Sequence, residues 1–575
     1  MYLRRCYRAK DGKRHAYWAL VKAVRTARGP RQEVVAYLGE MDEAGRLGIQ
    51  QAGAGAAGPV QKTLFAASVA RWVQVDPEAM RVENGRAFGG PWLGLEILRK
   101  LGVVELLGRL MPAGREDVPW PMMALVLVLS RLCDATSELH IAEHFYEQSA
   151  IADLLGVPAQ RVNDDRLYRA LDVLLPHKAE LEKHLKERLG ALFALEYDLL
   201  LYDVTSTYFE GQALTNPKAR RGYSRDSRPD CKQVCIGLVV SRCGMPLGYE
   251  VFAGNRADVT TLQEIVNTME QRYGRAQRIW VTDRGMISEA NIEFLRAGGR
   301  RYIVGTPKGM LKRFEQELLQ ENWAAVREGL EVKLCPGPEG QETFILCRSA
   351  DRRTKERAMH ERFEQRIDEG LARIHAACGR QRCDVVTIAR RVGRLLGQNT
   401  RAAGLFEVEV TVDARGAAQI TWHKQEAWRS WAQLSEGCYL LRSNVTDWTA
   451  EELWRAYMQL AEGAEGAFRI HKSDLRLRPI WHQKSERVEA HILVCFLAYV
   501  IWKTLGQMCH RAGLGDEPRK VFEEISRINV VDVIMPTSAG VDLRRRCVLR
   551  PRAHQAILLE RLGLHLPDRL ELVNM

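Results

Sequence analysis

Residues 199–209 read LLLYDVTSTYF, an apolar run that ends at Asp203 and continues into three hydroxyl residues. A short apolar run bounded by polar residues predicts a buried central strand. The acid at its end must meet a cation, a hydrogen-bond donor or water, because an unpaired buried carboxylate would not stay ionised. A single motif of this kind also fits an aspartate that caps the next turn.

A second copy of the pattern lies 80 residues later (283 − 203 = 80). Residues 278–286, RIWVTDRGM, again form an apolar strand that runs into an acid, Asp283, and Gly285 allows a sharp turn just after it. Two acids delivered by strand ends to one sheet edge predict shared hard cations, because Mg²⁺ prefers oxygen ligands. This arrangement is typical of two-metal phosphoryl transfer.

Composition limits the class of protein. The 575 residues are 46% hydrophobic and 27% charged, which is ordinary for a globular chain of several domains and excludes disordered, fibrous and membrane classes. A formal net charge of +12 and a pI of about 9.1 favour a polyanionic partner, and nucleic acid is the leading candidate.

Cysteine usage indicates a reducing compartment. The 13 cysteines are odd in number and form no C-x-x-C pair, and neither Cys231/Cys235 nor the group at 375–383 has zinc spacing. The basic N-terminus has no apolar core that would make it a secretion signal, and the longest apolar run, 492–502, is too short to cross a bilayer. We therefore expect a cytoplasmic protein with a buried core helix at 492–502 and no membrane partner.

The N-terminus is strongly basic. Residues 1–33 hold ten Lys and Arg against two acids, a balance of 10 − 2 = +8, with four aromatic residues interleaved. This pattern predicts a DNA-binding arm over 1–45, and its alternative is a solvated charged hairpin. The segment 46–62 is rich in glycine and alanine and predicts a flexible linker.

Helical periodicity dominates residues 63–195, which we expect to form a helical domain that contributes to DNA binding. Residues 197–252 then predict three consecutive strands. The loop between the first two carries five cations beside the first acid, as an enzyme acting on DNA phosphates would need: Lys218, Arg220, Arg221, Arg225 and Arg228.

Several spaced motifs stand in an order that resembles bacterial insertion-sequence transposases of the DDE type. They are YDVT at 202–205, GYSRD at 222–226 with RPD at 228–230, GNRAD at 254–258, VTDRG at 281–285, YLLRSN at 439–444, EGAFRIHKSDL at 465–475 and LRPI at 477–480. The resemblance covers roughly residues 1–564.

The resemblance implies an α/β fold with an RNase H-like mixed-sheet core, interrupted by a mostly β insertion domain. It also implies that Asp203, Asp283 and Glu465 are the catalytic acids and hold two Mg²⁺ ions, which Mn²⁺ can replace. The sequence supports Glu465 independently, because Glu465, Arg469 and Lys472 follow at i, i+4 and i+7 on one helical face.

The sequence departs from the family pattern before this glutamate. The family places a Tyr seven residues and an Arg four residues ahead of it, where this chain has Met458 and Ala461, and Tyr457 lies one residue away. The departure puts the auxiliary contacts in doubt more than Glu465, and Glu462 is the alternative catalytic glutamate.

Further residues are expected to contact DNA: Arg225, Arg284, Arg442, Arg469, Lys472 and Trp422. Trp422 lies in the insertion with Trp428 and Trp431, and these rings could stack on an unpaired base, although such tryptophans are more often core residues.

The predicted domains are a basic arm (1–45), a linker (46–62), a helical domain (63–195), the first part of the core (196–306), the insertion (307–437), the second part of the core (438–512) and a C-terminal region (513–575). The expected function is cleavage of an element's ends and joining of the 3′-hydroxyls to target DNA. Its partners would be double-stranded DNA at terminal inverted repeats and target sites, and a second copy of the chain on DNA, in a bacterial, nucleoid-associated setting. The alternatives are a stand-alone metal-dependent nuclease and a domesticated DNA-binding protein without catalysis.

Overall fold

The computed structural model divides into two compact units. Unit 1 comprises residues 1–197, 203–276 and 461–575, and unit 2 comprises 198–202 and 277–460. The described residues are 2–10, 13–26, 29–39, 73–337, 340–380, 383–413, 416–538 and 540–570. The predicted linker at 46–62 lies outside them.

A mixed sheet forms the core, as expected for the fold class, with strand order β10-β11-β12-β15-β9-β8-β5-β6-β7. Strand β5 (Leu199–Tyr208) is almost wholly buried, which explains its unbroken apolar run. In unit 2 its first residues pair in parallel with β8 (Ile279–Thr282), and β8 pairs in parallel with β9 (Arg301–Gly305). In unit 1 the antiparallel strands β6 (Gln233–Ser241) and β7 (Pro246–Ala253) complete the three-strand run predicted over 197–252.

The remaining strands of this sheet belong to unit 2 and extend it by antiparallel pairing from β9. They are β15 (Cys438–Ser443), β12 (Thr343–Ser349), β11 (Leu330–Pro336) and β10 (Ala324–Arg327). Short helices join the strands of both units: η4 (Asp258–Thr260), α10 (Leu262–Tyr273), η5 (Arg284–Met286), α11 (Glu289–Ala297), η6 (Lys308–Phe314) and α12 (Glu315–Leu319).

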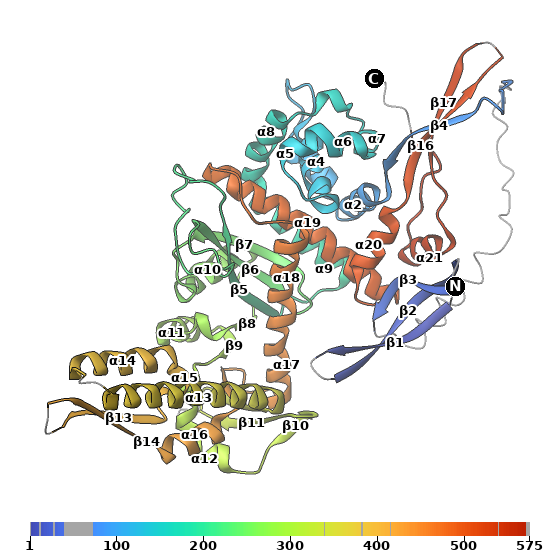
Figure 1. Ribbon diagram of the computed structural model, residues 1–575. Coiled ribbons are helices and arrows are strands. Elements are labelled where there is room, and N and C mark those ends of the chain that lie inside the picture. The colour runs from blue at the N-terminus through green and yellow to red at the C-terminus, as the bar shows by residue number, and fades with distance from the viewer. Residues whose placement is uncertain are drawn as a thin grey trace. The chain divides into compact units, whose positions relative to one another are not determined.

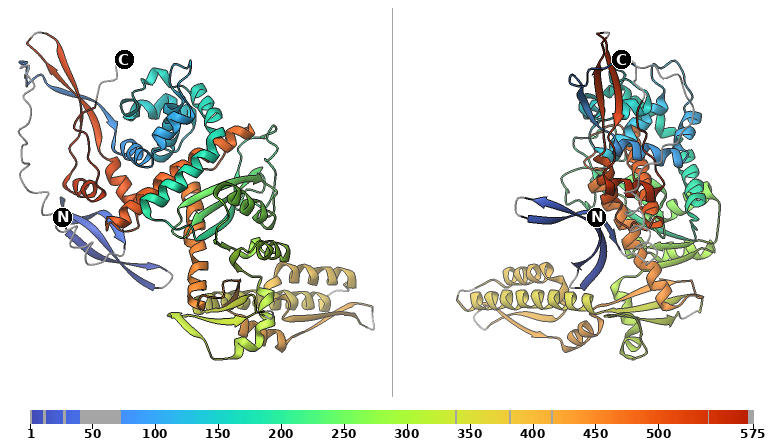
Figure 2. Two further views of the ribbon diagram at one scale, coloured as in Figure 1. Left: turned by 180° about the vertical axis from the view of Figure 1, so that it is seen from behind. Right: turned by 90° about the vertical axis from the view of Figure 1, so that its right-hand side faces the viewer.

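The insertion is not mostly β as expected, because its helices contain more residues than its strands. Residues 350–380 carry charges on most of their surface and still form one long helix, α13 (Ala350–Arg380), because a few apolar residues at helical spacing face a small core of their own. That core also takes α14 (Val385–Gln398), α15 (Thr400–Ala403) and the hairpin β13 (Phe406–Val412) and β14 (Ala418–Lys424). Helices α13 and α14 lie side by side (Figures 1 and 2), and α16 (Glu426–Ser435) leads back to β15.

Helices make up most of unit 1 before β5, in agreement with the predicted periodicity. They are α2 (Gly89–Lys100), α3 (Val103–Leu110), α4 (Trp120–Cys133), α5 (Glu138–His140), η1 (Ile141–Phe145), α6 (Tyr146–Gln148), α7 (Ile151–Leu155), η2 (Ala159–Arg161), α8 (Asp164–Leu174), η3 (Leu175–His177) and α9 (Lys178–Phe193). The basic N-terminal segment forms an antiparallel sheet of β1 (Tyr2–Lys10), β2 (Lys13–Thr26) and β3 (Gly29–Gly39).

A long helical run follows β15: α17 (Ala450–Leu460), the π-helical turn η7 (Ala461–Glu465), α18 (Gly466–Arg469) and a second π-helical turn, η8 (Ile470–Asp474). Helix α19 (Ser485–Arg511) is long and apolar enough to cross a membrane by length and composition alone. However, 83% of its most apolar window is buried inside the protein, as expected for a core helix.

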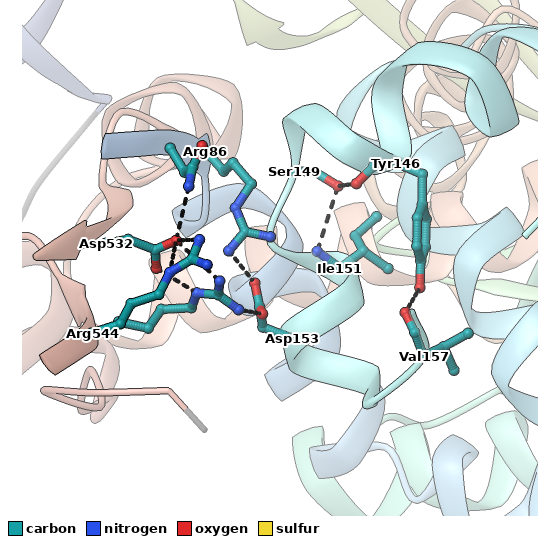
Figure 3. Close-up of polar contacts among 10 residues, drawn as sticks. Arg86, Tyr146, Ser149, Ile151, Asp153, Val157, Asp532 and Arg544 are labelled. Carbon is teal, nitrogen blue, oxygen red and sulfur yellow. Dashed lines mark hydrogen bonds and ion pairs between the residues drawn. The ribbon is translucent and has the colours of Figure 1, made fainter. Parts of the chain in front are cut away.

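The C-terminal region continues with α20 (Pro518–Ser526), β16 (Asn529–Pro536), β17 (Asp542–Val548) and α21 (Ala553–Leu562). Strand β16 pairs with both β17 and β4 (Arg81–Ala87), so two distant segments of unit 1 share a sheet. A buried charge network holds this sheet: Asp532 pairs with Arg544 and Arg546, and Asp153 of α7 pairs with Arg86 and Arg546 (Figure 3).

Candidate active site

Only the second candidate aspartate ends its strand as predicted: Asp283 directly follows β8, whereas Asp203 lies within β5, which continues through the hydroxyl residues to Tyr208. Tyr202 of β5 and Thr282 of β8 are partners in the parallel pair, and each is followed directly by an acid, Asp203 and Asp283. Asp203 is partly buried, and its Oδ1 accepts a hydrogen bond from the Val204 N–H at 2.8 Å. Asp283 is exposed at the end of its strand.

A tyrosine holds the Asp283 carboxylate. The Tyr457 hydroxyl of α17 donates to Asp283 Oδ1 at 3.1 Å. Burial raises the pKa of Tyr457, and the Asp283 carboxylate raises it further, so this hydroxyl stays a proton donor. Gly305 of β9 makes room for the contact, because a Cβ there would overlap the tyrosine hydroxyl.

This contact accounts for the spacing that departs from the family pattern. Tyr457 lies eight residues before Glu465, one more than the pattern requires. The π-helical turn η7 lies between them, and such turns commonly occur as single-turn bulges that close i→i+5 hydrogen bonds within α-helices. One extra residue absorbed in this turn explains why a tyrosine contacts the second aspartate although the expected position holds Met458.

Glu465 ends that π-helical turn and is exposed, and Glu462 in the same turn is exposed as well. Arg469 is exposed one turn further along the helix. A second π-helical turn holds Lys472, so the residues after Glu465 do not follow a regular α-helical face. The i, i+4, i+7 face predicted from the sequence is therefore only approximate.

Two loops of unit 1 hold the cationic side chains near Asp203. The loops approach each other closely at two glycines: a Cβ on Gly222 would overlap the Gly254 carbonyl oxygen, and a Cβ on Gly254 would overlap the carbonyl oxygens of Gln233 and Arg220. The close approach lets Arg225 of the first loop pair with Asp258 of the second. The Arg225 N–H also donates to Ser206 Oγ of β5 at 3.2 Å, which fixes the loop to the strand that carries Asp203.

The charge of Arg225 is secured by its neighbours. Burial alone would lower its pKa, but the Asp258 carboxylate, with a smaller contribution from Asp203, raises it. Arg225 is therefore protonated and interacts electrostatically with the Asp203 carboxylate.

Lys472 is held by an acid that the sequence did not single out. Asp226, whose side chain is 2% exposed, accepts from Lys472 Nζ at 2.8 Å and also pairs with Arg478. Burial lowers the pKa of Lys472, and Asp226 opposes that shift. Asp226 and Asp258 lie in the GYSRD and GNRAD motifs, so their place in the chain, though not their partners, was visible in the sequence.

The other residues expected at DNA have mixed surroundings. Arg284 is exposed directly after Asp283. Arg442 of β15 is 8% exposed, and its guanidinium binds Glu342 at 2.9 Å and Glu289 at 3.0 Å. Trp422 is partly buried and packs against the core of the insertion. Both side chains thus have structural partners in unit 2.

The donor set fits a hard divalent cation. Each candidate ligand offers carboxylate oxygens, and the Asp283 carboxylate is exposed with a tyrosine hydroxyl on one oxygen. A different cluster, Glu138, His482 and His491, also brings three ligand-type atoms within 4.8 Å of one another in unit 1. It is built from residues of α5, α19 and the loop before α19.

The comparison with known families identifies the chain. A family model described as a transposase DDE domain matches residues 194–501, more than half of the chain, which therefore belongs to the DDE transposases. Enzymes of this class generally use divalent metal ions. Comparison with curated proteins gives no match. Among solved structures, the chain is similar to a cryo-EM structure of the piggyBac transposase synaptic complex with hairpin DNA, at 8% identity and a TM-score of 0.33, over 79% of this chain and 82% of that one.

Proposed function

We propose that this protein binds the terminal inverted repeats of an insertion sequence, cleaves the DNA at their ends and joins the freed 3′-hydroxyls to target DNA. The observation that carries the proposal is the register of β5 and β8, which pairs Tyr202 with Thr282, so that the residue directly after each partner is an acid, Asp203 or Asp283. Membership in the DDE transposases supports the same reaction. The protein would act on bacterial DNA in the cytoplasm, as a dimer that brings two ends together.

Asp203, Asp283 and Glu465 are the proposed ligands of two Mg²⁺ ions. The bound ions would supply an activated water for hydrolysis and stabilise the attacking and leaving oxygens of each phosphoryl transfer. Tyr457 orients the Asp283 carboxylate through its hydrogen bond, so that this ligand is held before DNA binds.

The cations of unit 1 would bind DNA phosphates. Arg225 is fixed between Ser206 and Asp258, and a guanidinium can contact two phosphate oxygens at once. Lys472 offers a single ammonium held by Asp226. The basic N-terminal sheet, with the +8 balance of residues 1–33, is the proposed contact to the repeats outside the cleavage site.

The test is a cleavage and strand-transfer assay on DNA that carries the element's ends, with Mg²⁺ or with a chelator. Asp203→Ala, Asp283→Ala and Glu465→Ala should each abolish cleaved and joined products while DNA binding in chelator persists. Glu462→Ala is the matched control from the same π-helical turn and should keep activity.

Other outcomes decide between the alternatives. Cleavage without joined products would favour a stand-alone nuclease, and metal-independent binding with no cleavage in the unsubstituted protein would favour a domesticated DNA-binding protein. An active Glu465→Ala protein together with an inactive Glu462→Ala protein would move the third acid to Glu462.

A further inference from the structure

A pocket of about 600 Å³ lies in unit 1, apart from the candidate catalytic residues. Its wall comes from the end of α4, the turn into α5, helix α8, the segment 476–482 and the start of α19. This volume is within the range of small-molecule sites and far larger than a single ion needs.

The floor of the pocket is polar and buried. Glu138 is 4% exposed and lies 3.3 Å from His482 Nε2. Burial alone would raise the pKa of Glu138, but the His482 hydrogen bond and nearby cationic groups lower it to about 2, so the carboxylate is ionised. Burial holds the pKa of His491 well below its usual value.

The wall of the pocket is cationic. Arg131 is 5% exposed, and its Nε has no hydrogen-bond partner in the described parts of the chain. A buried guanidinium with an unsatisfied donor is costly unless a ligand supplies an acceptor. Arg476 is exposed and has a φ of 43°, a left-handed conformation that few non-glycine residues adopt. Arg478 also lines the wall and is held by Asp226.

A flat apolar surface stands at the rim. The Trp481 side chain is 67% exposed although it follows the buried Ile480 directly. Tyr168 lies deeper in the wall and contacts the His482 ring edge to face, with centroids 5.9 Å apart. An exposed tryptophan beside cations is typical of surfaces that stack bases of single-stranded nucleic acid.

We propose that this pocket binds one unpaired nucleotide of the DNA substrate, its phosphate on Arg131 and Arg476, its base on Trp481 and its base edge at Glu138 and His482. Three guanidiniums in the wall disfavour a metal cation at the Glu138 cluster, and they favour a ligand that combines an anion with a flat ring. That the nucleotide belongs to a DNA substrate rests on the proposed function. That the ligand is a nucleotide rests on the residues of the pocket alone.

The test measures binding by fluorescence anisotropy, with the full-length protein in chelator so that cleavage plays no part. The probes are a labelled oligothymidine of about 12 nucleotides and a blunt duplex of the same length, each with and without millimolar thymidine monophosphate as competitor. Trp481→Ala should weaken single-strand binding about tenfold and duplex binding less than about twofold. Leu319→Ala is the control, since Leu319 is also 67% exposed but lies in unit 2.

A second variant tests the phosphate contact. Arg476→Ala removes an exposed side chain, so folding is retained, and it should lower the salt-dependence slope of single-strand binding by about 0.7, the value for one phosphate contact. Arg131→Lys keeps the charge and removes Nε, and should weaken single-strand binding as well. Competition by thymidine monophosphate that Trp481→Ala abolishes would assign the site to nucleotides in general.

Several results would overturn the proposal. One is unchanged single-strand affinity in both Trp481→Ala and Arg476→Ala, and another is an equal loss for both probes. A third is a stoichiometric metal ion that co-purifies and is lost in Glu138→Gln. Failure of the proposed function looks different: the unsubstituted protein would bind the oligothymidine through this pocket but would not cleave or join element ends.

Discussion

Replacing Asp532 by alanine should open the C-terminal sheet of unit 1 locally. This carboxylate is fully buried, and it accepts from Arg546 Nε at 2.7 Å, from Arg544 Nε at 3.1 Å and from Asn84 Nδ2 at 3.2 Å. Burial alone would raise the pKa of Asp532, but the two arginines hold it well below its usual range.

The magnitude follows from the charges left behind. Without Asp532 the network keeps three guanidiniums and only Asp153. Removal of one partner of a buried ion pair costs about 3–5 kcal/mol, because the remaining charge stays buried without compensation. At 1.4 kcal/mol per factor of ten, amide exchange in β16 should accelerate by about 100-fold to 4,000-fold.

The assay is hydrogen–deuterium exchange by mass spectrometry on peptides that cover β16 and β17. Asp542→Ala is the matched control, because Asp542 pairs with Arg81 across the same sheet but both side chains are about half exposed. Such a surface pair is worth about 0–1 kcal/mol, so its loss should change exchange less than about fivefold. Equal exchange in the two variants would refute the reasoning.

Three further results are expected. Tyr457→Phe should slow DNA cleavage about tenfold, because it removes the donor to Asp283, while Met458→Ala should leave the cleavage rate unchanged. A slower cleavage rate in Met458→Ala than in Tyr457→Phe would contradict the role assigned to Tyr457. Gly305→Ala should reproduce the Tyr457→Phe defect by displacing that hydroxyl, and full activity would contradict it. Burial lowers the pKa of His471 to about 4, so the unfolded chain binds the extra proton between about pH 6.5 and 4. The free energy of unfolding, measured by thermal melts, should therefore fall by about 3 kcal/mol as the pH is lowered through that window. The same pH change should lower the free energy of unfolding of His471→Gln less.

The strands of the core could be predicted because burial on both faces leaves a signal in the sequence. The apolar runs at 199–202 and 279–282 form the first part of β5 and the whole of β8, and an acid follows each run, although β5 continues beyond its acid to Tyr208. The insertion was expected to be mostly β, but its helices outweigh its strands, and α13 alone spans 31 residues although it buries only four of them.

The partners of the candidate site could not be predicted from spacing. Asp226 and Asp258 reach Lys472 and Arg225 only because the chain folds back over long sequence separations. Tyr457 was set aside because counting residues assumes a regular α-helix, and η7 is not one.

The π-helical turn at Ala461–Glu465 also bears on how length changes are tolerated in this part of the chain. A one-residue gain inside an α-helix normally rotates everything beyond it by about 100°. A local bulge confines that rotation to one turn, so neighbouring side chains can keep their orientation across an insertion. Alignments of relatives should therefore allow a single gap here. Deletion of Ala464 should convert this turn to regular α-helix and shorten the interval between Tyr457 and Glu465 from eight residues to the seven of the family pattern.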